Sequence, residues 1–301
     1  MVSPAQAPTG RPTAPAKALV GLIGAGIQRS LTPAMHEEEA RHQGLRLHYQ
    51  LIDLDRSGAG AEQLPTLIAA ARMMGFAGLN ITYPCKQAVI PLLDELSDEA
   101  RAMGAVNTVV IRDGRLIGHN TDGSGWSNAF RRALPQADLS RVTLLGAGGA
   151  GAAIAHAALR MGVGHLVVND REPQRASELA QVLCGLYGAD RTSAATDIAQ
   201  ALQGARGLIH ATPTGMDKMP GLPLPQALLH PGLWVAEVVY FPLETALLKA
   251  ARAKGCASVD GGGMAVWQAV GAFELFTGLA PDAARMDAFF RQRVAERSET
   301  A

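Results

Sequence analysis

The sequence predicts an α/β fold with two domains, each built on a mainly parallel sheet that is covered by helices. The chain has 301 residues, a length that corresponds to roughly two ordinary domains. Short apolar runs alternate with amphipathic segments in two series, one before residue 121 and one after residue 140. Alternation of this kind is typical of parallel sheets with helical crossovers. The glycine-rich segment "LLGAGGAG", which follows an apolar run in the second series, is the third observation.

The first series predicts strands and helices in turn. We expect strands at 18–24, 45–54 and 76–82, with helices at 32–44 and 62–75 between them. Thr32 is expected to cap its helix, with Pro33 at the first helical position. Asp113-Gly114 lies between two apolar runs and predicts a two-residue hairpin.

The second series predicts a further sheet, and two helices come after it. We expect strands at 141–146, 165–170, 207–212 and 233–240, and helices at 150–162, 175–183, 244–255, 264–278 and 282–297. Residues 1–17 are rich in Pro and Ala and lack the apolar region of a signal peptide. We predict that these residues form a disordered tail.

The composition excludes several classes of partner. The 27 basic and 27 acidic residues balance, whereas a nucleic-acid or membrane-surface protein needs a basic stripe. No apolar stretch reaches the ~18–20 residues of a membrane span. Cys85, Cys184 and Cys256 are widely spaced and form no CxxC pair. We therefore expect a cytoplasmic protein without a disulfide framework or a metal site.

The glycine-rich segment predicts a dinucleotide site. Gly146, Gly148 and Gly151 have G-x-G-x-x-G spacing, follow a predicted strand and open an Ala-rich helix. In this fingerprint the glycines allow a tight turn, a close approach of the pyrophosphate and close helix packing. Asp170 ends the next strand, where a carboxylate binds the ribose hydroxyls of NAD and repels the 2′-phosphate of NADP. Arg171 could hold that phosphate, so we expect NAD and leave NADP open.

An earlier segment, "GLIGAG" at 21–26, imitates this fingerprint, with Asp53 as an apparent acidic partner. Arg29 occupies the place of the third glycine, and the helix is expected to start only at Thr32. We interpret the segment as a loop that presents Ser30 and Thr32 to a polar ligand at the carboxyl edge of the sheet.

Lys86 and Asp122 are the candidates for proton transfer. Lys86 follows the strand that ends in "NIT", and Asp122 in "GHNTDG" lies at the expected mouth of the cleft between the domains. A paired lysine and aspartate can hold a substrate hydroxyl and move its proton. The two histidines of "HEEEARH" fall on different helix faces and do not predict a metal site.

Several motifs in order give a resemblance to a known family. "SLTPAMHE", "NITYPCK", "GAVNTVV", "GHNTDG", "GAGGAG", "VVYFPLET" and "GGGMAVWQAV" resemble the successive motifs of the shikimate dehydrogenase family. The resemblance runs from about Leu19 to about Arg291. The Thr of "SLTP" and the Asp of "VVND" are most like the NAD-dependent quinate/shikimate dehydrogenase branch, since the biosynthetic NADP branch usually shows Ser-x-Ser and "NRT".

The resemblance implies a role for each motif. Lys86 would be the catalytic acid/base, with Asp122 as its partner. A hydroxylated ring carboxylic acid would be bound by Ser30, Thr32, Thr82, Asn107, Tyr240 and Gln268, supported by Asn80 and Thr121. The cofactor would lie against Gly146, Ala147, Gly148, Gly149, Ala150, Asp170, Arg171, Thr212, Val238 and Gly261. Two departures lie on the cofactor side, because His210 stands where the family often has Asn and Glu237 where it usually has Asp.

The resemblance also implies a division of the chain and a reaction. Residues 18–121, rejoined by 260–301, would form the substrate domain, and residues 122–259 the Rossmann cofactor domain. The reaction would be the reversible oxidation of the C3 hydroxyl of quinate or shikimate, in a monomer or a homodimer. An NADP-dependent shikimate or aminoshikimate dehydrogenase, a methylenetetrahydrofolate dehydrogenase and a cofactor-binding regulator remain alternatives. The 5% aromatic content disfavours a folate cleft, and an intact Lys86–Asp122 pair disfavours a regulator.

Overall fold

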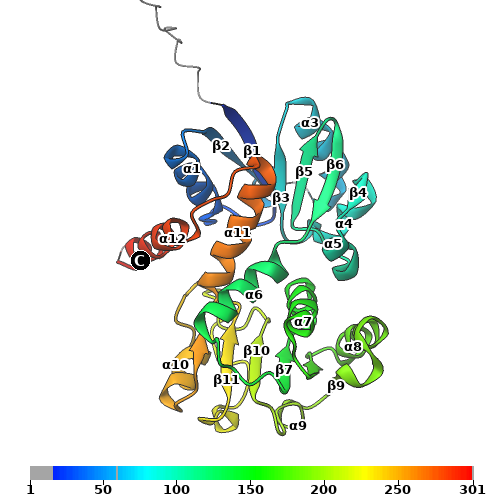
Figure 1. Ribbon diagram of the computed structural model, residues 1–301, viewed down its shortest axis with the longest axis vertical. Helices are drawn as coiled ribbons and strands as arrows, with labels where there is room; N and C mark the ends of the chain where they lie inside the picture. Colours follow the sequence, from blue (N-terminus) through cyan, green and yellow to red (C-terminus); the bar gives the residue numbers. More distant parts are fainter. Residues whose placement is uncertain (1–15, 59, 300–301) are drawn as a thin grey trace, which may run out of the picture.

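Two six-stranded sheets form the two lobes of the molecule, and two helices lie between them (Figure 1). The computed structural model describes residues 16–58 and 60–299. Residues 1–15 of the predicted tail lie outside the described residues. Lys17, which we assigned to that tail, instead opens the first strand. Among the described residues, no helix is long and apolar enough to cross a membrane.

The first sheet is mixed. Its strands lie in the order β2 (Arg46–Asp53), β1 (Lys17–Gly24), β3 (Gly78–Ile81), β5 (Thr108–Arg112), β6 (Arg115–His119) and β4 (Glu95–Leu96). Strand β1 pairs in parallel with β2 and β3, and β4 with β6, whereas β5 is antiparallel to both β3 and β6. The two-domain α/β prediction is confirmed, but one strand of this sheet, β5, runs opposite to the others.

The hairpin itself forms at the predicted residues. Asp113 and Gly114 both have positive φ angles, of 52° and 77°. Two positive φ angles define the type I′ turn, whose twist matches that of the flanking strands. The short Asp-Gly signal therefore fixed both the place and the register of the β5–β6 pair.

Short helices surround the first sheet. They are α1 (Thr32–His42), α2 (Leu54–Ser57), α3 (Leu64–Met73), α4 (Cys85–Ala88) and α5 (Asp98–Met103), with 3₁₀ turns η1 (Ala61–Gln63) and η2 (Ile90–Leu92). The expectation that Thr32 caps α1 was wrong. The N-cap position is Leu31 and carries no side-chain hydrogen bond. The Ser30 hydroxyl, two residues before the expected cap, accepts the Thr32 N–H at 3.2 Å.

The second sheet is parallel throughout. Its strands lie in the order β12 (Ser258–Val259), β11 (Trp234–Glu237), β10 (Gly207–His210), β7 (Arg141–Leu145), β8 (His165–Asn169) and β9 (Thr192–Ala194). The helices of this lobe are α7 (Gly149–Met161), α8 (Pro173–Tyr187), α9 (Ile198–Ala201) and α10 (Ala246–Ala253), with η3 (Ala189–Arg191) and η4 (Gln226–Leu228). The strand order reverses at β7, and a reversal of this kind marks the ligand edge of doubly wound sheets.

Helices α6 (Asp122–Ala133) and α11 (Gly262–Thr277) cross closely between the two sheets (Figure 1). A Cβ atom at Gly125 would lie only 2.7 Å from the backbone nitrogen of Gln268. One at Gly263 would lie 2.9 Å from the Cβ of Ala129. Glycine therefore allows the two backbones to approach. The sequence analysis missed α6, because its Gly and Ser residues resemble those of a loop.

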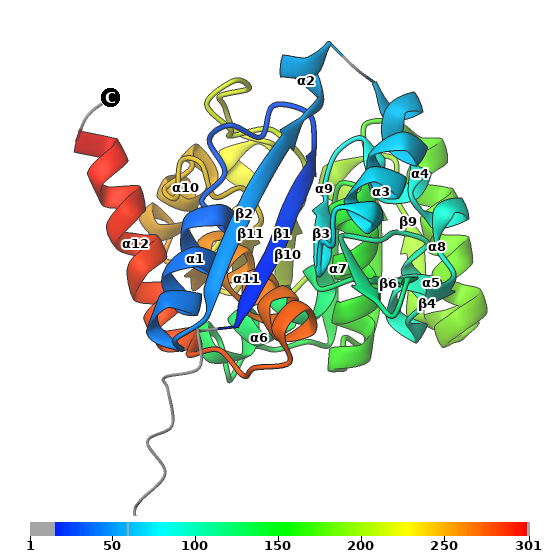
Figure 2. The same cartoon turned by 90° about the horizontal axis from the view of Figure 1, so that it is seen from above.

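The last two helices pack against the first lobe. Phe276 of α11 shares a buried cluster with Val20, Leu22 and Tyr49 of the first sheet. Helix α12 (Ala283–Glu299) runs beside α1 (Figure 2). The chain thus starts in the first lobe, builds the second lobe and returns to cover the first.

Candidate active site

Lys86 lies on the first turn of α4, directly after the turn that follows β3. The buried side chain of Cys85 anchors this turn, and the Val106 N–H donates to the Lys86 carbonyl at 2.9 Å. The Lys86 Nζ lies 2.5 Å from Oδ2 of Asp122. The Lys86 side chain is 22% exposed and that of Asp122 only 9%, so the ion pair is largely withdrawn from water. A lysine is retained here because a carboxylate faces it.

Asp122 is held in place by its neighbours. Its second oxygen, Oδ1, accepts the Asn107 amide at 2.9 Å. Its backbone N–H donates to Oδ1 of Asn120 at 3.0 Å. The same Asn107 amide also donates to the Thr121 hydroxyl, at 3.0 Å. These bonds leave Oδ2 directed at Lys86. Because the Asn107 amide nitrogen already donates to Asp122 and Thr121, a ring acid that binds it would have to replace one of these two bonds.

A chain of buried hydrogen bonds leads from Asn107 into the first sheet. The Thr108 hydroxyl donates to Asn107 at 2.9 Å and accepts from the Asn80 amide at 3.0 Å. The Tyr49 hydroxyl donates to Oδ1 of Asn80 at 2.6 Å. Burial raises the pKa of the Tyr49 phenol well above its usual value, so it remains a donor. Asn80 is therefore bound by protein groups at both ends of its amide, which suits a supporting role.

Tyr240 and Gln268 approach Asp122 from the other side. Tyr240 follows β11 and is partly exposed, and burial of its phenol together with the charge of Asp122 raises its pKa. The Tyr240 hydroxyl is therefore close enough to Asp122 to be affected by its charge. Gln268 lies where α11 meets Gly125 of α6, and its side-chain amide donates to the Ala265 carbonyl at 3.1 Å.

Thr82 lies against the glycine-rich loop that follows β1. A Cβ atom at Gly24 would lie 2.3 Å from Cγ2 of Thr82, so only glycine allows the two segments to meet. Asp53 accepts the Gly26 N–H at 3.1 Å and the Gln28 amide at 2.9 Å. Its carboxylate therefore holds its own loop.

The predicted dinucleotide loop connects β7 to α7. Gly146 has a φ of +108°, and a Cβ there would lie 2.8 Å from the Ala211 carbonyl. A Cβ at Gly151 would lie 2.0 Å from the Gly146 carbonyl. Around Gly148 and Gly149, by contrast, no atom lies within 4 Å of such a Cβ. The loop is tight on its inner side and open above the start of α7, which fits a pyrophosphate at a helix N-terminus.

The other predicted cofactor residues lie along the same edge. Oδ2 of Asp170 accepts the Ala147 N–H at 2.7 Å, which turns the carboxylate across the loop. Thr212 packs beside Gly146, with its Cγ2 3.0 Å from the position of a Cβ there. A Cβ at Gly261 would lie 2.4 Å from the Val238 carbonyl. Asp170 and Thr212 therefore both lie against the glycine loop, and Arg171 is exposed.

Comparison with known proteins identifies the family. Residues 22–109 match the family model for the shikimate dehydrogenase substrate binding domain, and residues 261–288 match that for the shikimate 5'-dehydrogenase C-terminal domain. The chain is 61% identical over 270 residues to the shikimate dehydrogenase (NADP(+)) of Streptomyces avermitilis, covering 89% of this chain and 93% of that protein. The chain belongs to the shikimate dehydrogenase family.

Two further members of the shikimate dehydrogenase family are similar over most of the chain. The quinate/shikimate dehydrogenase (NAD(+)) of Corynebacterium efficiens is 48% identical, over 90% of this chain and 97% of that protein. The structure of quinate dehydrogenase from Corynebacterium glutamicum in complex with NAD superposes with a TM-score of 0.87 at 47% identity, covering 92% of this chain and 99% of that one.

Three residues of this family member's site escaped the sequence analysis. Thr108 and Asn120 stand next to quoted motif residues, so the motifs "VNTVV" and "GHNTDG" carried a signal for both. Tyr49 had no such signal, because it lies in an ordinary alternating strand and reaches Asn80 only through the pairing of β1 with β2 and β3.

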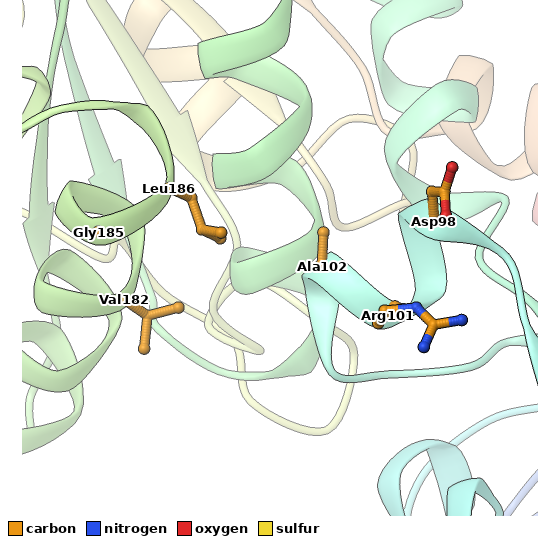
Figure 3. A pocket seen from close by; sticks show the side chains of 6 residues that line it. All are labelled: Asp98, Arg101, Ala102, Val182, Gly185 and Leu186. Atoms are coloured by element: carbon orange, nitrogen blue, oxygen red, sulfur yellow. The ribbon is translucent and has the colours of Figure 1, made fainter.

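A hollow between α5 and α8 lies outside the predicted site. It is lined by Asp98, Arg101, Ala102, Val182, Gly185 and Leu186 (Figure 3). None of these residues belongs to the Lys86–Asp122 site or to the glycine loop. Within residues 16–58 and 60–299, no group of three or more His, Cys, Asp or Glu side chains is placed to hold a metal ion.

Proposed function

We propose that this protein is an NAD(P)-dependent dehydrogenase that reversibly oxidises the C3 hydroxyl of quinate or shikimate to the 3-dehydro acid. The observation that carries the proposal is the Lys86–Asp122 pair, whose 2.5 Å contact withdraws an acid/base group from water. Membership of the family and the open glycine loop supply the context in which such a pair acts on an alcohol.

Lys86 is the group that moves the proton. In its neutral form Nζ would take the hydroxyl proton of the ring acid, and a bound nicotinamide would supply the hydride acceptor. In the reverse direction the Lys86 ammonium returns the proton to the ketone oxygen. Asp122 orients the amine and balances its charge, while Asn107 keeps the carboxylate from turning away.

The ring acid is held by groups from both lobes. Ser30, Thr32 and Thr82 supply hydroxyls from the first sheet's carboxyl edge, and Tyr240 and Gln268 approach from the α11 side. Asn80 and Thr121 support Asn107. These roles are proposals that rest on the family motifs and on the contacts described above.

Cofactor choice depends on Asp170 and Arg171. We propose NAD, because the Asp170 carboxylate lies beside the loop where an adenosine ribose would bind and would repel a 2′-phosphate. NADP remains possible through Arg171, and the relatives above carry names of both kinds. The assignment to the NAD-dependent quinate/shikimate branch rests on Asp170 together with Thr32.

Three further predictions belong to this proposal. The substrate domain comprises residues 18–121 and 260–301, and the cofactor domain residues 122–259. The protein acts in the cytoplasm. It acts as a monomer or a homodimer.

Steady-state assays test the proposal directly. Quinate and shikimate are each offered with NAD and with NADP, and we expect turnover of at least one acid, with NAD preferred. Absence of turnover in all four combinations would overturn the dehydrogenase. Activity with shikimate and NADP alone would keep the dehydrogenase and overturn the branch and the cofactor assignment.

A further inference from the structure

His210 and Glu237 form a buried pair beneath the cofactor edge. They end the neighbouring parallel strands β10 and β11 and lie in register with each other. The imidazole Nδ1 is 2.8 Å from Oε1 of Glu237, and both side chains are fully buried. The proposed reaction assigns no role to either residue, although both are ionisable and lie within two residues of the predicted cofactor contacts Thr212 and Val238.

Counting hydrogen atoms fixes the roles of this pair. Oε1 of Glu237 also accepts the N–H groups of Val238 at 2.9 Å and Val239 at 3.0 Å. Oε2 accepts the Thr245 hydroxyl at 2.9 Å. The two backbone N–H groups can only donate, so Oε1 acts as an acceptor. The hydrogen between His210 and Glu237 therefore belongs to Nδ1.

The second nitrogen of the ring faces Thr212. Nε2 of His210 lies 2.5 Å from the Thr212 hydroxyl. This contact holds the Thr212 side chain in place at the end of β10. The Thr214 N–H, at 3.3 Å, is a further donor to the Thr212 oxygen. The Thr212 hydroxyl is thereby held by two protein contacts, and its methyl group lies against Gly146.

We infer that His210 and Glu237 are positioning residues that hold the Thr212 hydroxyl where it contacts the dinucleotide. This inference rests on the proposed function, because it takes the open side of the glycine loop to be the cofactor site. The pyrophosphate remains with the amides of the glycine loop.

The same carboxylate also braces the strand end that leads to the substrate side. By accepting the Val238 and Val239 N–H groups, Glu237 fixes the turn whose carbonyls pack against Gly261. Tyr240 follows directly. One buried pair thus sets Thr212 on one side of the cofactor edge and the Val238–Tyr240 segment on the other.

Direct binding of NADH and NADPH by titration calorimetry tests the inference without depending on turnover. Thr212→Ser keeps the oxygen and should hold the Kd within about twofold. Thr212→Val should raise it by roughly 3–20-fold, the effect of one lost neutral hydrogen bond. His210→Asn is too short to reach both Glu237 and Thr212, and should raise the Kd by a similar factor.

A double-mutant cycle separates positioning from a general structural effect. If His210 acts through Thr212, His210→Asn/Thr212→Val should bind no more weakly than Thr212→Val alone. The matched control is Thr245→Val, which removes the Glu237 contact on the side away from Thr212. It should lower the Tm and leave the Kd unchanged.

If the Kd increases of the two single variants multiply in the double variant, the inference is overturned. A His210→Asn variant with a lower Tm and an unaltered Kd would also overturn it. If the wild-type protein binds NADH but oxidises neither ring acid, the proposed function is overturned. A non-additive cycle for NADH binding in that protein would still support the role of His210. Binding of neither dinucleotide would overturn both.

Discussion

The Lys86 ammonium and the Asp122 carboxylate are 36 positions apart in the chain and 2.5 Å apart in space. Lys86 belongs to the short helix after β3, and Asp122 is the first residue of α6. The pair therefore ties the carboxyl edge of the first sheet to one of the two helices between the lobes. The distance between the two side chains therefore depends on how the lobes meet.

Removing the amine should abolish most of the turnover. Lys86→Ala is expected to lower kcat by roughly 10²–10⁴, because proton transfer by a positioned side chain contributes about that factor. The KM of the ring acid should change little. The exposed Lys254, substituted in the same way, is the control and should leave kcat unchanged. A Lys86→Ala enzyme with wild-type kcat would remove the lysine from the mechanism.

Cofactor preference should change at the end of β8. Asp170→Asn removes the charge that repels a 2′-phosphate and weakens the bond to the Ala147 N–H. The NADP-to-NAD ratio of kcat/KM should rise by roughly 10–100-fold, since a hydrogen bond to a charged group contributes about 1.5–3 kcal/mol. Arg171→Ala should lower the same ratio. If the unsubstituted enzyme already prefers NADP, Arg171 controls the pocket and the NAD assignment fails.

Substrate preference should respond to Thr32. Thr32→Ser deletes one methyl group, and a methyl in a pocket contributes about 1–3 kcal/mol of discrimination. We expect the quinate-to-shikimate ratio of kcat/KM to shift toward shikimate by roughly tenfold. Because α1 has no side-chain cap, urea unfolding should show the same stability in both proteins. An unaltered ratio would leave Thr32 without a role in specificity.

The α6–α11 crossing should not tolerate a methyl group. Gly125→Ala places a Cβ 2.7 Å from the Gln268 nitrogen, and overpacking of this kind costs about 1–3 kcal/mol in the free energy of unfolding. Gly185→Ala is the matched control, since Gly185 is an exposed glycine of α8 beside open space (Figure 3). Alanine should stabilise that helix by about 0.5–1 kcal/mol. Equal effects of the two substitutions in urea unfolding would mean that the crossing is not tight.

Stability should fall below neutral pH because of His36. Burial lowers the pKa of this histidine from 6.5 to about 4, although its Nδ1 bonds to the Thr32 carbonyl. Between pH 6.5 and about 4, His36 binds a proton in the unfolded chain but not in the folded protein. His36 therefore destabilises the fold progressively as the pH falls from 6.5 toward 4, by about 3 kcal/mol in all.

Urea unfolding at pH 7 and pH 5 measures this effect. His36→Gln cannot take up the proton, so its stability should depend less on pH over this interval than that of the wild type. Carboxylates with lowered pKa values, such as Glu39 and Asp282, titrate at lower pH and are common to both proteins. Identical pH slopes would show that His36 is not the group responsible.

Much of the fold could be predicted because the relevant signals are local. The glycine spacing at 146–151 encodes a strand, a turn and a helix within a few residues, and Asp113-Gly114 encodes its own hairpin. Helix α6 was missed because its glycines serve close contacts with other helices, and Gly125 meets α11 about 140 residues away. Thr32 was expected to be the N-cap and is instead the first helical residue, whose own N–H donates to the Ser30 hydroxyl.

The core of the site was predictable for a different reason. Lys86, Asp122 and Asn107 lie in motifs that a family resemblance exposes. The buried hydrogen bonds that support these residues were not predictable, because they depend on strand register. Asn80 lies opposite Thr108 in the antiparallel β3–β5 pair. Only that pairing brings the Thr108 hydroxyl within 3.0 Å of the Asn80 amide.

Because α11 returns to the first lobe, it affects the order in which the two lobes can fold during synthesis. Phe276 fills the space left by Gly78 and covers Val20 and Tyr49, although these residues leave the ribosome more than 190 residues earlier. All six strands of the second sheet are complete by Val259. The lobe that is synthesised second can therefore close first, against the usual N-terminal-first order. Until Phe276 emerges, one apolar face of the first sheet stays exposed to water and open to chaperones.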